Sequence, residues 1–334
     1  MIKFRLEELD VFRGVAALIV VIYHYTTRFN EKYVHSDELL FELPLKYFGV
    51  DFFFVVSGFV IFMTINRTNK SMDFVVSRFS RLFPAYWLAI ILTTIVMLTF
   101  GLPDKTLSIS QVLVNFTMLQ EFMGVEPVDS VYWTLTRELI FYASILIIYK
   151  LGFTNRIIPI ISIWLLIQLF SELMLIYTGY FPWKITFLLN LEYANLFGAG
   201  IVFYLLKTKP ELKYLHYLIA LCLINYFIRH GLELGLLTGL IYASFYLFIY
   251  GKLSFICVKP LIFLGTISYS LYLIHENIGF IIIRLLSDFG INSNIAILAT
   301  IFMSIILAST MTYKIERPAN VWLRNRYKNR LITT

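Results

Sequence analysis

Apolar stretches long enough to cross a lipid bilayer recur along this whole 334-residue chain. A hydrocarbon core about 30 Å thick needs about 20 mostly apolar residues per helix. Because backbone polar groups in lipid must be satisfied internally, these stretches predict helices rather than open sheet. The predicted fold is therefore an all-α, polytopic membrane helix bundle of about ten transmembrane helices, in a single domain over 1–334. The expected spans are 11–27, 46–66, 82–101, 131–150, 156–177, 185–206, 213–229, 231–251, 260–285 and 293–314.

One boundary in this series stays open. Only His230 separates the stretch at 213–229 from the one at 231–251. The two stretches are therefore either a tight hairpin or a single unit.

Basic residues indicate how the chain is oriented. Lys and Arg number 28 against 21 Asp and Glu, and most of them fall on the side of the N-terminus. Cytoplasmic loops carry such an excess, so both termini are expected in the cytoplasm. Membrane orientation and anionic lipids then account for the net charge of +7, and no nucleic-acid partner is expected.

The two ends of the chain and its cysteines exclude several alternatives. The opening MIKFRLEELD is interrupted by acidic residues, which predicts a retained first span rather than a cleaved signal peptide. Cys222 and Cys257 lie within or beside apolar stretches, so neither a disulfide framework nor a metal site is expected. No soluble domain is expected after the last span.

Several ionisable residues fall inside the predicted spans. Arg13 and His24 are eleven positions apart, which places them on the same face of one helix, about 16 Å apart along its axis. Asp51, Glu138 and His275 lie in the outer halves of later spans. An ionisable side chain at the centre of a span costs roughly 2.5–3.5 kcal/mol, so each is a candidate functional residue.

These residues form two chemical zones. Arg13, Arg78 and Arg81 make the inner zone cationic, which suits phosphate because arginine binds it bidentately. The outer zone combines histidines with carboxylates, which exchange protons near neutral pH. This layout fits acyl-coenzyme A held by its phosphates from the cytoplasm, with a hydroxyl acceptor approaching from outside.

Each of these candidate residues also has a purely structural explanation. Membrane orientation alone would place Arg78 and Arg81, and His275 could be a hydrogen-bonded structural residue. Asp51 could begin a helix, and Trp133 could be core rather than pocket. A secondary transporter with a proton relay is the competing function, although the inverted repeats common in transporters are not found here.

Six motifs in chain order resemble the bacterial integral-membrane acyltransferase 3 family. Thr134 replaces a serine of the family pattern and keeps its hydroxyl. The motifs are LDVFRGVAALIVVIYHY, FGVDFFFVVSGF, SRFSRLFPAYW, YWTLTRELIFY, LGTISYSLYLIHE and IERPA.

This resemblance implies an enzyme of the bacterial cytoplasmic (inner) membrane. It would be an O-acyltransferase that moves an acetyl group from cytoplasmic acetyl-CoA to a hydroxyl of an extracytoplasmic glycan. The acceptor would be of the O-antigen, capsule or exopolysaccharide type, free or lipid-linked, in contact with membrane lipids. The chain resembles the stand-alone form, without the C-terminal hydrolase-like domain of some relatives. A succinyl or other acyl donor, or a small-molecule acceptor, is the alternative.

The expected roles follow from the resemblance and the chemistry together. His24 is the expected general base, oriented by Glu138 as first choice or Asp51 as second. A covalent acyl-histidine at His24 is the alternative to direct transfer. Acetyl-CoA is the expected donor substrate, with no metal. The expected donor-binding residues are Arg13, Arg78 and Arg81, and the expected substrate-pocket residues are Trp133, Tyr269 and His275.

Overall fold

The regular elements of the described chain are helices. The computed structural model describes residues 6–103 and 105–333. Within these residues there is no strand, and Leu102 and Lys105 form one isolated bridge. The all-α prediction is confirmed.

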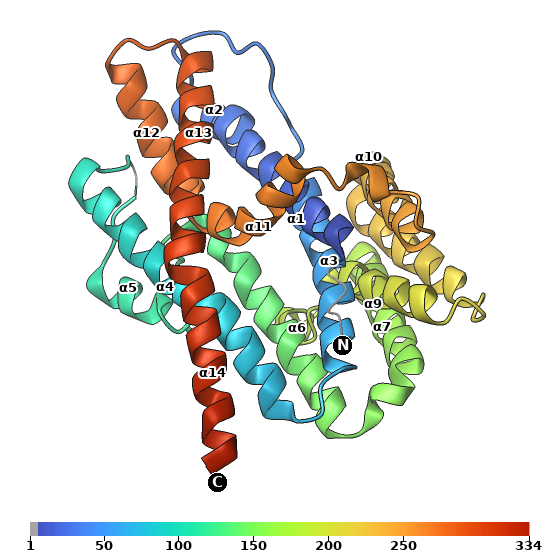
Figure 1. The fold of residues 1–334 in the computed structure, drawn as a ribbon. Coiled ribbons are helices and arrows are strands. Elements are labelled where there is room, and N and C mark those ends of the chain that lie inside the picture. Colours follow the sequence, from blue (N-terminus) through green and yellow to red (C-terminus); the bar gives the residue numbers. More distant parts are fainter. Residues whose placement is uncertain (1–5, 104, 334) are drawn as a thin grey trace. The chain divides into compact units, whose positions relative to one another are not determined.

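The helices drawn in Figure 1 belong to two units. The first comprises Met1–Arg13, Val50–Phe74 and Arg137–Lys259, and the second comprises Gly14–Gly49, Val75–Thr136 and Pro260–Thr334. Helix α1 (Glu7–Tyr23) belongs to the first unit up to Arg13 and to the second from Gly14.

The first unit is built mainly from six helices. Glycines allow α3 and α9 to approach closely: a Cβ atom on Gly58 would overlap the Phe197 carbonyl oxygen, and one on Gly200 would overlap that of Val55. Phe141 stacks on Phe197 with ring centroids 4.2 Å apart. The helices are α3 (Phe48–Ile65), α6 (Trp133–Lys150), α7 (Ile157–Thr178), α8 (Trp183–Leu188), α9 (Ala194–Thr208) and α10 (Leu215–Ile249).

The second unit holds the remaining helices. Tyr269 ties α11 to α4 by donating a hydrogen bond to the Leu82 carbonyl at 2.9 Å. Helices α11 and α12 meet at a bend of 77°. The helices are α2 (Phe29–Tyr33), α4 (Ser71–Phe100), α5 (Ile109–Asn115), α11 (Lys259–Ile274), α12 (Glu276–Asp288), α13 (Ser293–Met311) and α14 (Arg317–Thr333).

Helix α10 is a hairpin. Gly231 interrupts it with a left-handed φ of 79°, which a residue with a side chain rarely adopts. The Nδ1 atom of His216 lies 2.9 Å from the Tyr246 hydroxyl, whereas a straight helix would hold these residues about 45 Å apart. Of the two readings of residues 213–251, the tight hairpin is therefore the correct one.

Seven helices of the described residues are long and apolar enough to cross a membrane, or eight if the bent pair α11–α12 is one span. The expected number of ten is not confirmed. The stretch at 185–206 is broken into α8, a 3-10 turn and α9, with Asn190 in a left-handed conformation between them. The two arms of the α10 hairpin enter this number as one helix, because they form one continuous helical element. The chain is a multi-pass membrane protein, and the cytoplasmic position of its termini stays a prediction.

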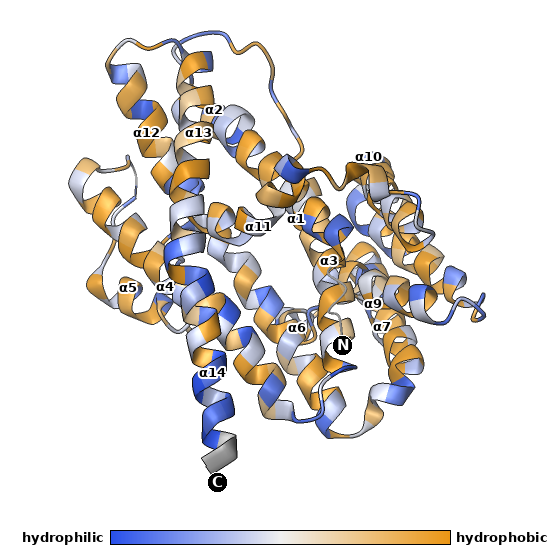
Figure 2. Cartoon of the chain, viewed as in Figure 1, coloured by the Kyte–Doolittle hydropathy of each residue, from blue (hydrophilic) through white to orange (hydrophobic). Residues whose placement is uncertain are grey.

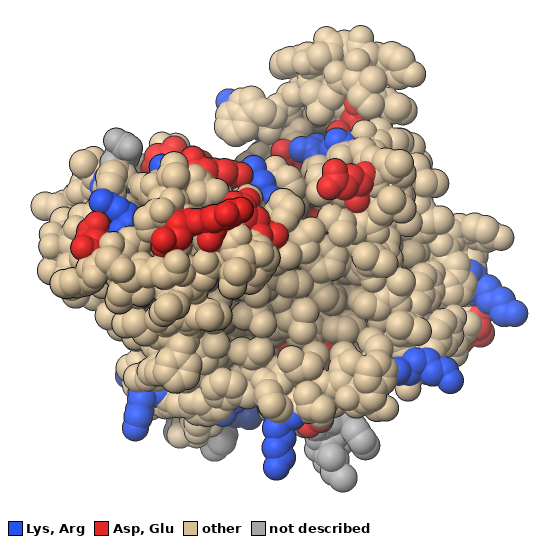
Figure 3. All heavy atoms as spheres, turned by 90° about the horizontal axis from the view of Figure 1, so that it is seen from above, with Lys and Arg blue, Asp and Glu red and all other residues tan. Residues whose placement is uncertain are grey.

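Charged residues are few in this chain. Apolar residues dominate most helices, whereas α14 is largely hydrophilic (Figure 2). On one face, acidic and basic side chains form a few groups on a surface that is otherwise uncharged (Figure 3). Such a surface suits a chain in which 15% of the residues are charged.

Candidate active site

His24 begins a π-helical turn, His24–Arg28, directly after α1. Such wide turns within helices are frequent at functional sites. The His24 Nδ1 atom lies 2.8 Å from the Val20 carbonyl oxygen. Because a carbonyl oxygen only accepts, Nδ1 carries the proton in this arrangement and Nε2 keeps its lone pair. His24 is thus prepared to act as a base through Nε2.

His275 lies at the bend between α11 and α12 and faces His24. Its Nδ1 atom donates to the Tyr272 carbonyl at 2.8 Å, which leaves Nε2 as an acceptor 3.3 Å from His24 Nδ1. The two rings are T-shaped, with centroids 4.8 Å apart. Val20 and His275 therefore both accept from the same N–H of His24 and fix its tautomer. Tyr25 holds the bend by donating to the His275 carbonyl at 2.8 Å.

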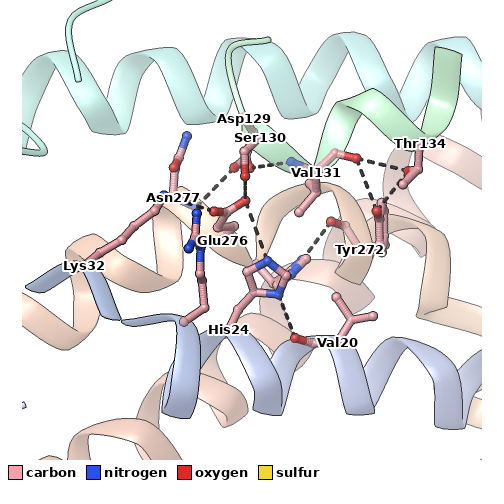
Figure 4. Close-up of polar contacts among 12 residues, drawn as sticks. Val20, His24, Lys32, Asp129, Ser130, Val131, Thr134, Tyr272, Glu276 and Asn277 are labelled. Atoms are coloured by element: carbon pink, nitrogen blue, oxygen red, sulfur yellow. Dashed lines mark hydrogen bonds and ion pairs between the residues drawn. The ribbon is translucent and has the colours of Figure 1, made fainter. Parts of the chain in front are cut away.

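Glu276 supplies the carboxylate beside His24 (Figure 4). Its Oε2 atom lies 3.9 Å from His24 Nε2, and its Oε1 atom lies 3.5 Å from Lys32 Nζ. The Ser130 hydroxyl also donates to Oε2. The Glu276 side chain is 1% exposed and the His24 side chain 13%. The arrangement pairs a fully buried carboxylate with a partly exposed histidine.

Asp129 lies beside Glu276 at the start of the short turn Ser130–Tyr132. Its carboxylate accepts from the backbone N–H of Asn277 at 3.1 Å. The Asn277 side chain donates in turn to the Val128 carbonyl at 2.9 Å, which joins this segment to α12. Burial raises the pKa of Asp129 above its usual range, and the charge of Glu276 raises it further.

The expected carboxylates Glu138 and Asp51 lie in the first unit. Glu138 accepts from Ser57 at 2.7 Å and from Tyr142 at 2.6 Å. Asp51 is buried and accepts from the Tyr226 hydroxyl. Each carboxylate therefore has hydroxyl donors within its own unit, whereas His24 belongs to the second unit.

The other expected residues fall in both units. Arg13 lies in α1 within the first unit, and Arg78 and Arg81 lie in α4 within the second. Tyr269 is buried and bonded to α4, and Trp133 begins α6. The structure thus brings His24 together with His275.

Asp129, Ser130 and Lys32 were not expected in the site. The sequence places Glu276 with His275 in the outer half of the ninth predicted span, but no role was expected for it. The available signal was the position of Glu276 directly after His275 in the motif LGTISYSLYLIHE. The described residues contain no group of three or more His, Cys, Asp or Glu arranged to hold a metal ion.

Comparisons with known proteins agree with an acyltransferase. The chain is 31% identical over 127 residues to nodulation protein 10 of Rhizobium leguminosarum bv. viciae. The matched region covers 32% of this chain and 33% of that protein. It is 32% identical over 100 residues to the exopolysaccharide production protein ExoZ of Rhizobium meliloti, covering 28% of this chain and 32% of that protein. These matches thus span about a third of each rhizobial relative.

A third relative is similar over a longer stretch. The ORF330 protein of Acidianus two-tailed virus is 23% identical over 280 residues, which are 79% of this chain and 80% of that protein. No solved structure matches the chain. The model of the acyltransferase domain family matches residues 6–313, nearly the whole chain, and the chain therefore belongs to this family of acyltransferases.

Proposed function

We propose that this protein is an O-acyltransferase of the bacterial cytoplasmic membrane. It moves an acetyl group from cytoplasmic acetyl-CoA to a hydroxyl of an extracytoplasmic glycan. The observation that carries this proposal is His24, whose Nδ1–H is held by two acceptors while Nε2 faces the Glu276 carboxylate. Membership of the acyltransferase family and the similarity to a protein named for exopolysaccharide production support the glycan acceptor.

The proposed reaction is a direct transfer. His24 Nε2 removes the proton of the acceptor hydroxyl as the hydroxyl oxygen attacks the thioester carbonyl carbon. The new C–O bond forms, the C–S bond breaks, and the coenzyme A thiolate leaves. The imidazolium then returns its proton to the thiolate, so the products are the acetyl ester and coenzyme A.

Glu276 is the proposed partner of His24 when its imidazole is protonated. Protonation of Nε2 creates a cation 3.9 Å from a carboxylate oxygen. An opposite charge at this separation favours the protonated imidazole. Asp129, hydrogen-bonded to Glu276, and Lys32 keep the carboxylate in place. Glu138 and Asp51 remain proposals for a second catalytic carboxylate.

The two ends of the substrate pair have different proposed binding residues. The phosphates of the donor bind to arginines, and the acceptor sugar binds beside the histidines. The proposed donor residues are Arg13, Arg78 and Arg81, and the proposed acceptor-side residues are Trp133, Tyr269 and His275.

The test is acetyl-CoA binding and turnover by purified protein in detergent. His24→Ala should keep binding and lose transfer, whereas Arg13→Ala should lose binding. His216→Ala is the control, because it removes a half-buried imidazole of α10 whose Nδ1 atom lies 2.9 Å from the Tyr246 hydroxyl. Full activity of His24→Ala would contradict the catalytic role.

Two further outcomes separate the alternatives. Turnover with succinyl-CoA but not acetyl-CoA would change the acyl group and keep the enzyme. No binding of any acyl-CoA by the wild type, together with solute flux in proteoliposomes, would replace the enzyme by a transporter.

A further inference from the structure

Arg324 of helix α14 meets the arginine pair of helix α4 within the second unit. The Arg324 Nη2 atom donates a hydrogen bond to the Ser77 hydroxyl. Arg78 Nη2 donates to the same hydroxyl at 3.2 Å. Arg81, one turn after Ser77, is near enough for its charge to repel that of Arg324. Two guanidinium groups therefore donate to one serine hydroxyl, and the charge of a third acts on Arg324.

This cluster lacks a counter-charge for two of its members. Among residues 6–103 and 105–333, neither Arg81 nor Arg324 has a carboxylate within ion-pair distance. The buried Nε atom of Arg324 also has no hydrogen-bond partner in that part of the chain. A serine hydroxyl accepts hydrogen bonds and leaves the repulsion between like charges in place. An anion between the arginines would satisfy both the donors and the charge.

A phosphate group fits these donors best. Guanidinium groups present planar pairs of N–H donors that match the oxygens of a phosphate, and several arginines together can bind a doubly charged group. Arg78 and Arg81, three residues apart, share one side of α4. Arg324 approaches from a second helix, so the donors converge from two directions.

We infer that Arg324 completes a phosphate site with Arg78 and Arg81, and that this site binds the nucleotide phosphates of the acyl donor. The inference rests on the proposed function for the identity of its ligand. Residue 324 lies beyond the family match, which ends at residue 313.

Helix α4 links this phosphate site to the candidate active site inside the second unit. Near its other end, the Met97 Sδ atom lies 3.6 Å from the side-chain nitrogen of Asn277. About 24 Å of helix axis separates Arg81 from Met97, at 1.5 Å per residue. Acyl-coenzyme A is a long molecule with its nucleotide phosphates at one end and its thioester at the other. It is therefore suited to two sites joined by a helix of this length.

The test compares Arg324→Gln with Arg326→Gln. Arg326 is an exposed arginine about 200° around the same helix, and its guanidinium lies 5.1 Å from the centre of the Trp322 ring. Each protein is placed in phosphatidylcholine nanodiscs, and the affinities for coenzyme A and for inorganic pyrophosphate are measured. Turnover is measured with acetyl-pantetheine, which lacks the nucleotide phosphates.

The inference predicts a selective loss. Arg324→Gln should weaken both coenzyme A and pyrophosphate by about tenfold or more, the effect of one charge-assisted hydrogen bond. Arg324→Lys should recover only part of the loss, because an ammonium group cannot bind a phosphate bidentately. Turnover of acetyl-pantetheine should equal that of the wild type, which shows that Arg324→Gln is folded. Arg326→Gln should match the wild type in every assay.

The possible outcomes test the phosphate site and the proposed acyltransferase function separately. Wild-type coenzyme A affinity in Arg324→Gln would overturn the inference and leave the acyltransferase function intact. An anionic phospholipid carries the same phosphate chemistry and is the competing ligand. Phosphatidylglycerol could raise the Tm of the wild type but not that of Arg324→Gln, while coenzyme A and pyrophosphate raise neither. In that case a lipid occupies the site and the inference is wrong. Pyrophosphate binding that needs Arg324, without coenzyme A binding by the wild type, would keep the phosphate site and contradict the proposed function.

Discussion

The Nε2 atom of His24 lies 3.9 Å from the Oε2 atom of Glu276. The two residues come from distant parts of the chain, and the bend between α11 and α12 places them together. Nδ1 of His24 is held by Val20 and His275, so Nε2 is the nitrogen that gains a proton. The carboxylate is therefore on the side of the ring where positive charge would develop.

Glu276→Gln should lower kcat about 100-fold and leave the Kd for acetyl-CoA unchanged, because the amide cannot stabilise an imidazolium. Initial rates and equilibrium binding on the same preparation check this expectation. Glu31→Gln is the control, since Glu31 is an exposed carboxylate that pairs with Arg28 at 2.7 Å. An unchanged kcat in Glu276→Gln would show that the carboxylate takes no part in the reaction.

Asp129 should make stability depend on pH. Its pKa is raised by burial, so the folded state holds a proton that the unfolded state releases above about pH 4. Its contribution to stability is fully present below that pH and is lost as the pH rises through the folded-state pKa. In Asp129→Asn an amide replaces the protonated acid. As the pH rises over this range, the Tm of Asp129→Asn should therefore fall less than the Tm of the wild type. Parallel Tm curves for the two proteins would contradict this assignment.

Gly58→Ala should destabilise the first unit. The added methyl group would overlap the Phe197 carbonyl and force α3 and α9 apart, at a cost of about 1–3 kcal/mol. Gly239→Ala is the matched control, because a Cβ at this helical glycine meets no other atom within 4 Å. The control should be neutral or slightly stabilising. Thermal unfolding in detergent measures both, and equal Tm values for the two variants would contradict the close approach.

Tyr226→Phe should also lower stability. The change removes the hydroxyl that donates to the buried Asp51 carboxylate and leaves that group short of a donor, at a cost of about 1–3 kcal/mol. Tyr250→Phe, at a tyrosine that is 61% exposed, is the control. Thermal unfolding and acyl transfer should be measured together. If Tyr226→Phe keeps its Tm but loses transfer, Asp51 acts in catalysis rather than in stability.

Hydropathy predicted the helical fold because lipid leaves few other choices for the backbone. The expected spans at 131–150 and 293–314 correspond closely to α6 and to α13 with its following turn. The break at Asn190 could not be predicted, because an apolar stretch has the same hydropathy whether or not one residue adopts a left-handed conformation. The seven or eight helices long enough to span therefore omit this stretch and include the α10 hairpin once, and the count of ten is not confirmed.

The candidate site could be predicted in part. His24 was identified as a candidate because an ionisable residue inside a span is costly, and His275 was identified in the same way. Their proximity depends on a 77° bend that hydropathy does not reveal. Glu276 was therefore not expected as the partner of His24, and the expected partners Glu138 and Asp51 were chosen from their depth and from the family motifs in which they lie.

The π-helical turn at His24–Arg28 separates two helical registers. A π-helical turn contains one residue more than an α-helical path of the same length. Deleting one residue of the turn after His24 would restore α-helical bonding and would rotate Lys32 by about 100° relative to α1. His24 would keep its register with α1, whereas Lys32 would turn away from Glu276 although no side chain of the site had been replaced. The wide turn is thus what brings the imidazole and the ammonium group to the same carboxylate.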